Sequence, residues 1–259
     1  MNASSTPRVG LGGRLWRAAL DLIYPARCVA CDDALDMPED VFCGGCTLTL
    51  APLVSACPRC ARPSPAQLER APPCLACLER PPRFTAASAG FEFGGAMAEA
   101  IRRLKWRHMP ELAPPLGGLL FYSLDRAPAD FRNIDLIAPV PLHRRRLRKR
   151  EFNQAAELAA ALREEARLQD APLGRVALDA RALERVRDTP PQTGLDSLQR
   201  RENMLDAFRV RNPARIDGKR VLLVDDVMTT GATADACAAA LDRAGAAAVL
   251  VLTLGRAVT

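Results

Sequence analysis

Apolar positions in the C-terminal two thirds of the chain form short continuous runs that alternate with stretches of helical period. The runs predict strands over residues 134–140, 221–224 and 248–254, and the periodic stretches predict helices over residues 97–105, 153–168 and 234–244. Gly245 follows the last of these helices, as a helix-ending glycine commonly does. Fully apolar strands alternating with helices indicate a parallel sheet covered on both faces. We therefore expect an α/β domain over residues 84–259.

The first 82 residues have a different composition. Residues 1–13 are small, polar and Gly-rich, and we expect no ordered structure there. Residues 14–24 have helical period and end at Pro25; we expect this helix to pack against the Cys-rich segment after it rather than to anchor in a membrane. Residues 25–82 are rich in Cys and Pro, and residues 80–83 are a plausible linker. Because this segment has little apolar material for a core, we expect metal to hold it together.

Eight of the nine cysteines form four Cys-x-x-Cys pairs: Cys28/Cys31, Cys43/Cys46, Cys57/Cys60 and Cys74/Cys77. Two such turns supply the four thiolates of a closed, structural zinc site, so the segment predicts a double zinc ribbon with two zinc ions. Sequential and interleaved pairing both fit the spacing. A redox dithiol normally has one pair beside a βαβ unit, and an iron–sulfur cluster is a minor alternative. The ninth cysteine, Cys237, lies in a predicted helix as a buried apolar residue.

The segment 221–233 has the pattern of a phosphate site. An apolar strand leads to Asp225 and Asp226, and a Thr-Thr-Gly-Ala-Thr loop then opens a helix. The carboxyl end of a parallel strand faces the usual ligand crevice, where two acids can accept hydrogen bonds from vicinal hydroxyls. A helix N-terminus suits a phosphate, and Gly231 allows close approach. The pattern thus predicts a ribose 5-phosphate held at both ends. Phosphoacceptor and Mg²⁺-dependent phosphatase sites also pair acids after a strand, but need no such loop.

The net charge and the length of the apolar runs limit the kinds of partner and the location that we expect. The net charge of +6 and pI near 9.0 favour polyanionic partners such as nucleotides, pyrophosphate or nucleic acid. No apolar run approaches the length of a membrane span, so we expect a cytoplasmic protein without membrane insertion. Residues 144–150 carry six positive charges, which suit a solvated loop, pyrophosphate binding or contact with a nucleic-acid backbone. Trp106 and Phe152 could stack on bases, although aromatic residues total only 5%.

These motifs carry a resemblance to a known family. Residues 221–233 match the phosphoribosyl-diphosphate (PRPP) signature of phosphoribosyltransferases, and the chain from about Leu15 onward resembles the ComF family of competence-associated proteins. Residues 91–105 resemble that family's early motif and residues 139–154 its central motif. Residues 192–195 with Arg200, Asn203 and 207–208 resemble its third motif. Glu151 departs from the pattern, because the family usually has Gly there.

The resemblance implies residue roles. Asp225 and Asp226 would hold the ribose hydroxyls and serve catalysis. The 5-phosphate would be held by Thr229, Thr230, Gly231, Ala232 and Thr233. Residues 139–146, with Val140 and Pro141, would form a pyrophosphate loop. Residues 187–203 would form a mobile hood whose Arg187, Arg200 and Arg201 neutralise pyrophosphate. Mg²⁺ would bridge pyrophosphate and ribose oxygens. His143 lies in the pyrophosphate loop and has at most a modest role.

Two classes of function follow from the resemblance. One is an enzyme that transfers phosphoribose from PRPP and releases pyrophosphate. The other is an accessory factor for DNA uptake that binds single-stranded DNA or a DNA-uptake helicase or ATPase. No residue pattern marks a pocket for an acceptor, so the sequence leaves both classes open.

Overall fold

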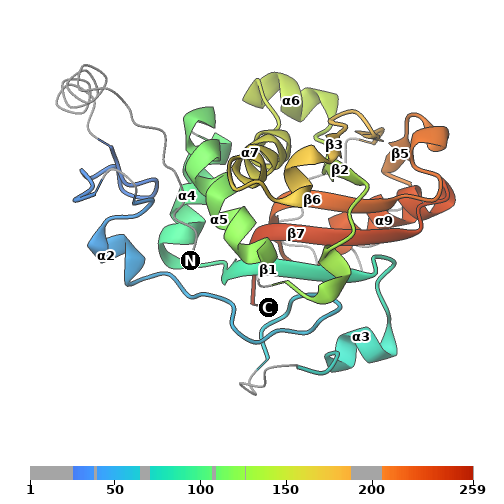
Figure 1. Cartoon of the computed structure of the whole chain (residues 1–259), viewed down its shortest axis with the longest axis horizontal. Helices are drawn as coiled ribbons and strands as arrows, with labels where there is room; N and C mark the ends of the chain where they lie inside the picture. Colours follow the sequence, from blue (N-terminus) through green and yellow to red (C-terminus); the bar gives the residue numbers. More distant parts are fainter. Residues whose placement is uncertain are drawn as a thin grey trace, which may run out of the picture.

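The computed structural model describes residues 26–37, 40–64, 71–106, 109–125, 127–187 and 206–258 (Figure 1). Its main sheet has five parallel strands in the order β1-β7-β6-β2-β3. The strands are β1 (Ala86–Glu92), β2 (Leu136–Pro139), β3 (Ala177–Leu178), β6 (Arg220–Met228) and β7 (Ala248–Arg256). A separate antiparallel hairpin joins β4 (Leu183–Arg185) and β5 (Phe208–Val210). The parallel sheet confirms the α/β class.

Helices connect these strands. They are α2 (Gly44–Thr47), α3 (Leu75–Glu79), α4 (Gly95–Trp106), α5 (Ala113–Asp125), α6 (Arg144–Arg150), α7 (Gln154–Leu168) and α9 (Ala232–Arg243). Short 3-10 turns occupy Pro110–Leu112, Ala129–Phe131, Pro172–Arg175 and Pro213–Arg215. The three predicted helices of the α/β domain are confirmed as α4, α7 and α9, whereas the helix expected at 14–24 lies outside the described residues. Among the described helices, none combines the length and apolar character that crossing a membrane requires.

The sheet separates two buried layers of side chains. Leu222 and Val224 of β6 face α4, α5 and α7, whereas Leu223 of β6 and Val251 of β7 face α9. Alternate residues of a strand point to opposite faces, so continuous apolar runs are required where both faces are covered. We call these layers the α4 face and the α9 face. Cys237 of α9 is fully buried on the α9 face, as predicted.

The Cys-rich segment packs against both faces of the sheet. Val29 and Phe42 are buried in the α4 face, whereas Ala61 is buried in the α9 face with Phe84. Between them, the chain runs antiparallel to β1: the Glu92 N–H donates to the Ala51 carbonyl at 2.8 Å, and the Leu53 N–H donates to the Gly90 carbonyl at 2.9 Å. The connecting chain therefore covers the open edge of the sheet.

Strand β6 is longer than the sequence predicted. The expected strand ended at Val224, but β6 continues to Met228 because β7 pairs with it through Thr253, Gly255 and Arg256. Asp225 and Asp226 consequently lie within the strand rather than after it. Helix α9 likewise begins at Ala232, two residues before its predicted start.

The basic run at 144–150 is the helix α6, which corrects the interpretation as a loop. Its Arg, Lys and Leu residues are good helix formers, and its last cations favour the negative end of the helix dipole. The Nδ1 atom of His143 caps its start by accepting the Arg145 N–H at 3.4 Å. Glu151 ends it at φ 66°, in the left-handed region that Gly tolerates best. The chain therefore has Glu, where the family usually has Gly, at a position whose backbone is left-handed.

Candidate functional site

The order of the strands in the sheet shows where a ligand crevice would lie. The connection through α7 leads from β2 to β3 on one side, and the connection through α9 leads from β6 to β7 on the other. The two helices cover opposite faces of the sheet. Neighbouring parallel strands whose connections diverge leave a crevice outside their carboxyl ends, which is where open α/β sheets bind ligands. The carboxyl ends of β2 and β6 define this crevice.

The two adjacent acids of β6 point to opposite faces of the sheet. Asp226 is 2% exposed, and its Oδ2 lies 2.7 Å from the Lys105 Nζ on α4. Asp225 lies toward α9, beside a cavity of about 30 Å³ that Thr253 of β7 also lines. Neighbouring positions on a strand cannot share a face, so a ligand that contacts both carboxylates must sit over the strand end rather than on one face.

Asp225 has an unusual electrostatic environment. Burial, together with the nearby Asp226 carboxylate, raises the pKa of Asp225 to about 8, against the opposing charge of Lys105. Its Oδ1 accepts the Asp226 N–H at 2.9 Å. Without a ligand, the Asp225 carboxyl therefore favours the protonated form at neutral pH. A ligand that offers hydroxyl donors or a bound cation would favour the ionised form.

The phosphate loop, residues 229–233, joins β6 to α9. Gly231 occupies the N-cap of α9 at φ 83°, where a side chain would be strained. The Asp235 N–H already donates to the Gly231 carbonyl at 2.8 Å, and Thr230 Oγ1 accepts the Ala232 N–H at 3.4 Å. The start of α9 carries positive partial charge and amide donors at this edge of the crevice, which suits an anion.

The opposite wall of the crevice is the end of β2. The Val140 N–H donates to the Val224 carbonyl at 2.9 Å, which keeps the 139–141 segment beside β6. Asn153 fixes that segment to α7: its Nδ2 donates to the Val140 carbonyl at 3.1 Å, and its Oδ1 accepts the Ala155 N–H at 3.2 Å. Val140 and Pro141 are both buried, so only their backbone can face a ligand.

The structure places the acids, the phosphate loop and the 139–141 segment at the same end of the sheet. Arg187 is exposed just beyond β4, and the remaining hood residues, including Arg200 and Arg201, lie outside the described residues. Sequence reasoning gave no role to Lys105. It also gave no particular role to Arg150, whose charge interacts with those of Asp225 and Asp226 and whose pKa burial lowers. Both are cations at the end of a helix, a position that sequence alone does not relate to a distant strand.

The eight paired cysteines form two separate clusters. Cys28, Cys31, Cys43 and Cys46 make the first, and Cys57, Cys60, Cys74 and Cys77 the second, with all ligand atoms of each cluster within 4.8 Å of one another. The pairing is therefore sequential, which decides between the two arrangements that the spacing allowed.

Both clusters fit a structural zinc ion. The Cys31–Cys43 and Cys60–Cys74 Sγ atoms are 3.6 Å and 3.7 Å apart, close to the edge of about 3.8 Å of a tetrahedron with Zn–S bonds of about 2.3 Å. A hydrogen bond with Cys60 and the backbone N–H of Cys74, which donates to Cys57 Sγ at 3.2 Å, lower the pKa of Cys57 to about 4 despite burial. Amides directed at sulfur stabilise thiolate, the form that binds zinc.

The two ribbons repeat one local geometry. Asp32 and Ala61 both lie four residues after the first cysteine of their cluster, and both adopt positive φ, at 72° and 53°. The bridges Arg27–Ala34 and Ala56–Pro63 close the same turn in each ribbon. Two copies of one turn explain how the same Cys-x-x-Cys spacing builds two similar sites.

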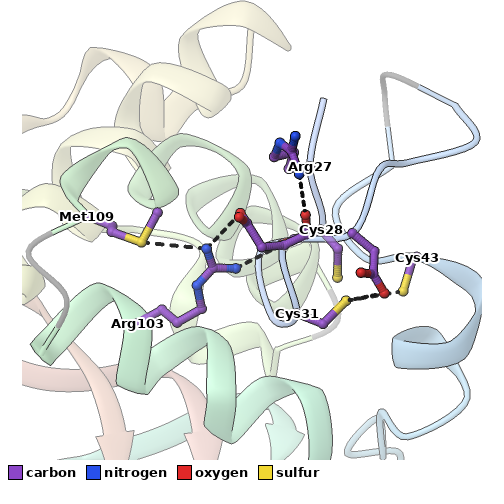
Figure 2. Close-up of polar contacts among 8 residues, drawn as sticks. Arg27, Cys28, Cys31, Cys43, Arg103 and Met109 are labelled. Atoms are coloured by element: carbon purple, nitrogen blue, oxygen red, sulfur yellow. Dashed lines mark hydrogen bonds and ion pairs between the residues drawn. The ribbon is translucent and has the colours of Figure 1, made fainter. Parts of the chain in front are cut away.

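The first ribbon is fixed to the α/β domain by a buried arginine. Arg103 of α4 is 3% exposed and donates through Nη1 to the Cys28 carbonyl at 3.0 Å and through Nη2 to Asp32 Oδ1 at 2.8 Å. Figure 2 shows the Arg103 side chain between Met109 and the loop that carries Cys28. A planar guanidinium can bind a carbonyl and a carboxylate at once, so it holds the ribbon in one orientation.

This combination defines a class: a phosphoribosyltransferase-type domain joined to a double zinc ribbon. Comparison with known families agrees, because residues 19–78 match the double zinc ribbon domain and residues 154–257 match the phosphoribosyl transferase domain.

Relatives extend over nearly the whole chain. The DNA utilization protein YhgH of Salmonella typhimurium is 32% identical over 237 residues, covering 91% of this chain and 99% of the relative. That of Escherichia coli K12 is 31% identical with the same coverage. Competence protein F of Haemophilus influenzae is 28% identical over 235 residues, covering 89% and 97%. The chain belongs to this family, the ComF family of double-zinc-ribbon proteins.

Proposed function

We propose that the crevice between β2 and β6 binds PRPP with Mg²⁺. The observation that carries the proposal is the placement of two acids on opposite faces of β6 near its carboxyl end, two residues before a phosphate loop at a helix N-terminus. Asp225 and Asp226 then hold the two ribose hydroxyls from either side of the strand end. The amides and threonine hydroxyls of the phosphate loop hold the 5-phosphate.

The charges around the crevice suit the rest of this ligand. The 139–141 segment and the start of α6 lie across from the acids, where the pyrophosphate group of PRPP would extend. Arg150 supplies positive charge near both carboxylates, and a Mg²⁺ ion bound with the ligand would supply more. Lys105 forms an ion pair with Asp226, so the charge of one carboxylate is neutralised before the ligand binds.

The same arrangement can support phosphoribosyl transfer. The bond between C1 and the pyrophosphate oxygen breaks, the electron pair leaves with pyrophosphate, and an amine or ring nitrogen forms the new bond to C1. Positive charge develops on the sugar ring, which the acids can stabilise, while cations stabilise the leaving group. Release of pyrophosphate in the presence of an amine or nitrogen base is the measurement that separates transfer from binding alone.

Calorimetric titration of Mg²⁺–PRPP tests the binding proposal. We expect saturable binding to the wild type and its loss in Asp225→Ala/Asp226→Ala. The control is Asp242→Asn at the far end of α9, which removes one exposed carboxylate from the helix that follows the phosphate loop. Absence of binding to correctly folded, zinc-loaded wild-type protein would overturn the proposal.

A second candidate function is binding of single-stranded DNA beside the crevice. Trp106 is 59% exposed at the end of α4, and the Arg150 guanidinium lies 4.3 Å from its ring centroid. Arg150 is the last residue of helix α6, which carries five further cations. Cations with an accessible aromatic ring are the elements that bind a nucleic-acid backbone and its bases. The names of the relatives make a role in DNA utilization consistent with this surface.

Salt and substitution distinguish this second function from the first. We expect single-stranded DNA affinity to fall as salt rises and to drop at least about tenfold in Trp106→Ala, which removes a stacking ring. The complex should survive Asp225→Ala/Asp226→Ala. DNA binding that requires those acids, or that ignores Trp106 and salt, would contradict this placement.

A further inference from the structure

Arg256, the last residue of β7, is a charged side chain in an almost fully buried position. It is 1% exposed, at the end of a strand whose other residues are apolar, Thr or Gly. A buried guanidinium is tolerated only when its N–H groups are satisfied, because removing a charge from water is costly. The identity of its partners therefore indicates why the position is occupied by arginine.

Arg256 donates to backbone carbonyls from two distant parts of the chain. Its Nε donates to the Cys60 carbonyl at 2.9 Å. Its Nη1 donates to the Met228 carbonyl at 3.1 Å and also to those of Thr229 and Ala257. Cys60 is a ligand in the second zinc cluster, Met228 directly precedes the phosphate loop, and Thr229 is the first residue of that loop. One planar group thus connects a zinc ribbon to the loop.

Packing around Arg256 reinforces this connection. Ala61, next to Cys60, is buried in the same layer as Phe84, Met228 and Ala232. A Cβ atom added at Gly231 would lie 3.6 Å from the Met228 Sδ and 4.0 Å from the Phe84 Cζ, so the phosphate loop rests on these two side chains. The phosphate loop therefore packs against the second ribbon and the segment that follows the ribbon. Arg256 makes the polar contact between the loop and the ribbon.

Arg103 provides an internal reference for Arg256. Both are buried arginines that donate to the carbonyl of a zinc-ligating cysteine, Cys28 for Arg103 and Cys60 for Arg256. The other hydrogen-bond acceptors of Arg103 are Asp32 and Met109. Among its contacts with described residues none reaches the phosphate loop, whereas Arg256 contacts the loop directly.

We propose that Arg256 is a positioning residue through which the zinc-loaded second ribbon holds the phosphate loop, so that the second zinc site controls affinity for the phosphate ligand. The amides of an anion site must be fixed before the ligand arrives, since ordering them on binding lowers affinity. Arg256 fixes the first residues of the loop to the knuckle around Cys60, and zinc fixes the knuckle. This control of the crevice rests on the proposed binding of PRPP.

Hydrogen exchange of the loop amides tests the connection without any ligand. In zinc-loaded protein, we expect Arg256→Met to raise exchange at residues 229–233 at least about tenfold, while both zinc ions remain bound. Arg103→Met should leave loop exchange unchanged. Arg256→Lys keeps the charge but not the planar set of donors, and we expect an intermediate increase. Cys74→Ser, which leaves Arg256 in place but removes a ligand of the second zinc, should raise loop exchange as Arg256→Met does.

Titration with Mg²⁺–PRPP on the same variants tests the consequence for binding. We expect the Kd to rise about tenfold to a hundredfold in Arg256→Met, the range seen when a supporting residue of a site is lost, and to change less than about threefold in Arg103→Met. Unchanged loop exchange in Arg256→Met and Cys74→Ser would overturn the inference even if PRPP binds. If the wild type does not bind PRPP, the proposed function fails, and the exchange data alone still decide whether Arg256 holds the loop. If Arg256→Met does not fold, Arg256→Lys carries the same test.

Discussion

The two faces of the sheet carry the same kinds of residues, but these residues make different contacts on each face. Each face has a zinc ribbon, a buried arginine on a ligand carbonyl, and one acid of the β6 pair. On the α4 face the ribbon is fixed to a helix, and the acid, Asp226, is paired with Lys105. On the α9 face the ribbon is fixed to the phosphate loop, and Asp225 has a raised pKa. The charge of the acid on the α4 face is thus neutralised before a ligand binds. The acid on the α9 face gains its partner only when a ligand binds.

Loss of a zinc site should give the largest effect. Structural zinc contributes about 10–16 kcal/mol of apparent binding energy in small zinc domains, so we expect Cys57→Ser to lower the free energy of unfolding by more than about 5 kcal/mol. Zinc content should fall from two ions to one per chain, and Cys28→Ser should show the same stoichiometry from the other ribbon. Metal analysis and urea unfolding in zinc-containing buffer measure both. Full stability in zinc-free protein would contradict the structural role of the metal.

Removal of the arginine on the α4 face should come next. Arg103→Met leaves the buried Cys28 carbonyl without its donor, and we expect a loss of about 2–3 kcal/mol in urea unfolding. The control is Arg102→Met on the same helix, where the exposed ion pair with Glu99 contributes less than about 1 kcal/mol. Equal effects of the two substitutions would show that Arg103 does not hold the first ribbon.

Substitution of the two acids should have opposite effects on stability. The folded protein holds the Asp225 proton up to about pH 8, whereas the unfolded chain releases it near pH 4, so the stability contributed by this group is lost as pH rises from about 4 to 8. Asp225→Asn should therefore stabilise the ligand-free protein most at pH 8.5 and least at pH 4. Asp226→Asn breaks the ion pair with Lys105 and should destabilise the protein. Thermal unfolding at several pH values measures both, and an Asp225→Asn effect that does not depend on pH would contradict the assignment.

The smallest effect should come from the end of α6, beside the crevice. Glu151 has φ 66°, so Glu151→Gly should stabilise the protein by up to about 1 kcal/mol by relieving left-handed strain. Glu157→Gly within α7 is the opposite control and should destabilise by about 1 kcal/mol. Destabilisation by both substitutions would mean that the Glu151 side chain makes contacts worth more than its backbone strain.

Local features of both faces were predictable from sequence, but the relation between them was not. Apolar runs and helical periods gave β2, β6, β7, α4, α7 and α9, because each pattern reports burial of one short segment. The spacing of the four cysteine pairs predicted the two zinc ribbons, because ligands of one metal ion must lie at fixed distances along the chain. The position of Asp225 and Asp226 within β6 escaped prediction, because the length of that strand depends on its pairing with β7.

Contacts between distant segments were also missed. Arg103, Lys105 and Arg256 lie in stretches where a cation is ordinary, and their partners become evident only once α4, β7 and the ribbons are packed together. The predicted last strand ended at residue 254, so only the structure places Arg256 within β7. Spacing alone left the cysteine pairing open, and the folded chain resolved it.

A crystal structure of the zinc-loaded protein with Mg²⁺–PRPP would test the proposed ligand site most directly. We predict the 5-phosphate at the amides of residues 229–233, the ribose hydroxyls at Asp225 and Asp226, and the pyrophosphate toward the 139–141 segment. A ligand bound elsewhere, or a crevice that stays empty at saturating PRPP while the phosphate loop keeps its geometry, would contradict it.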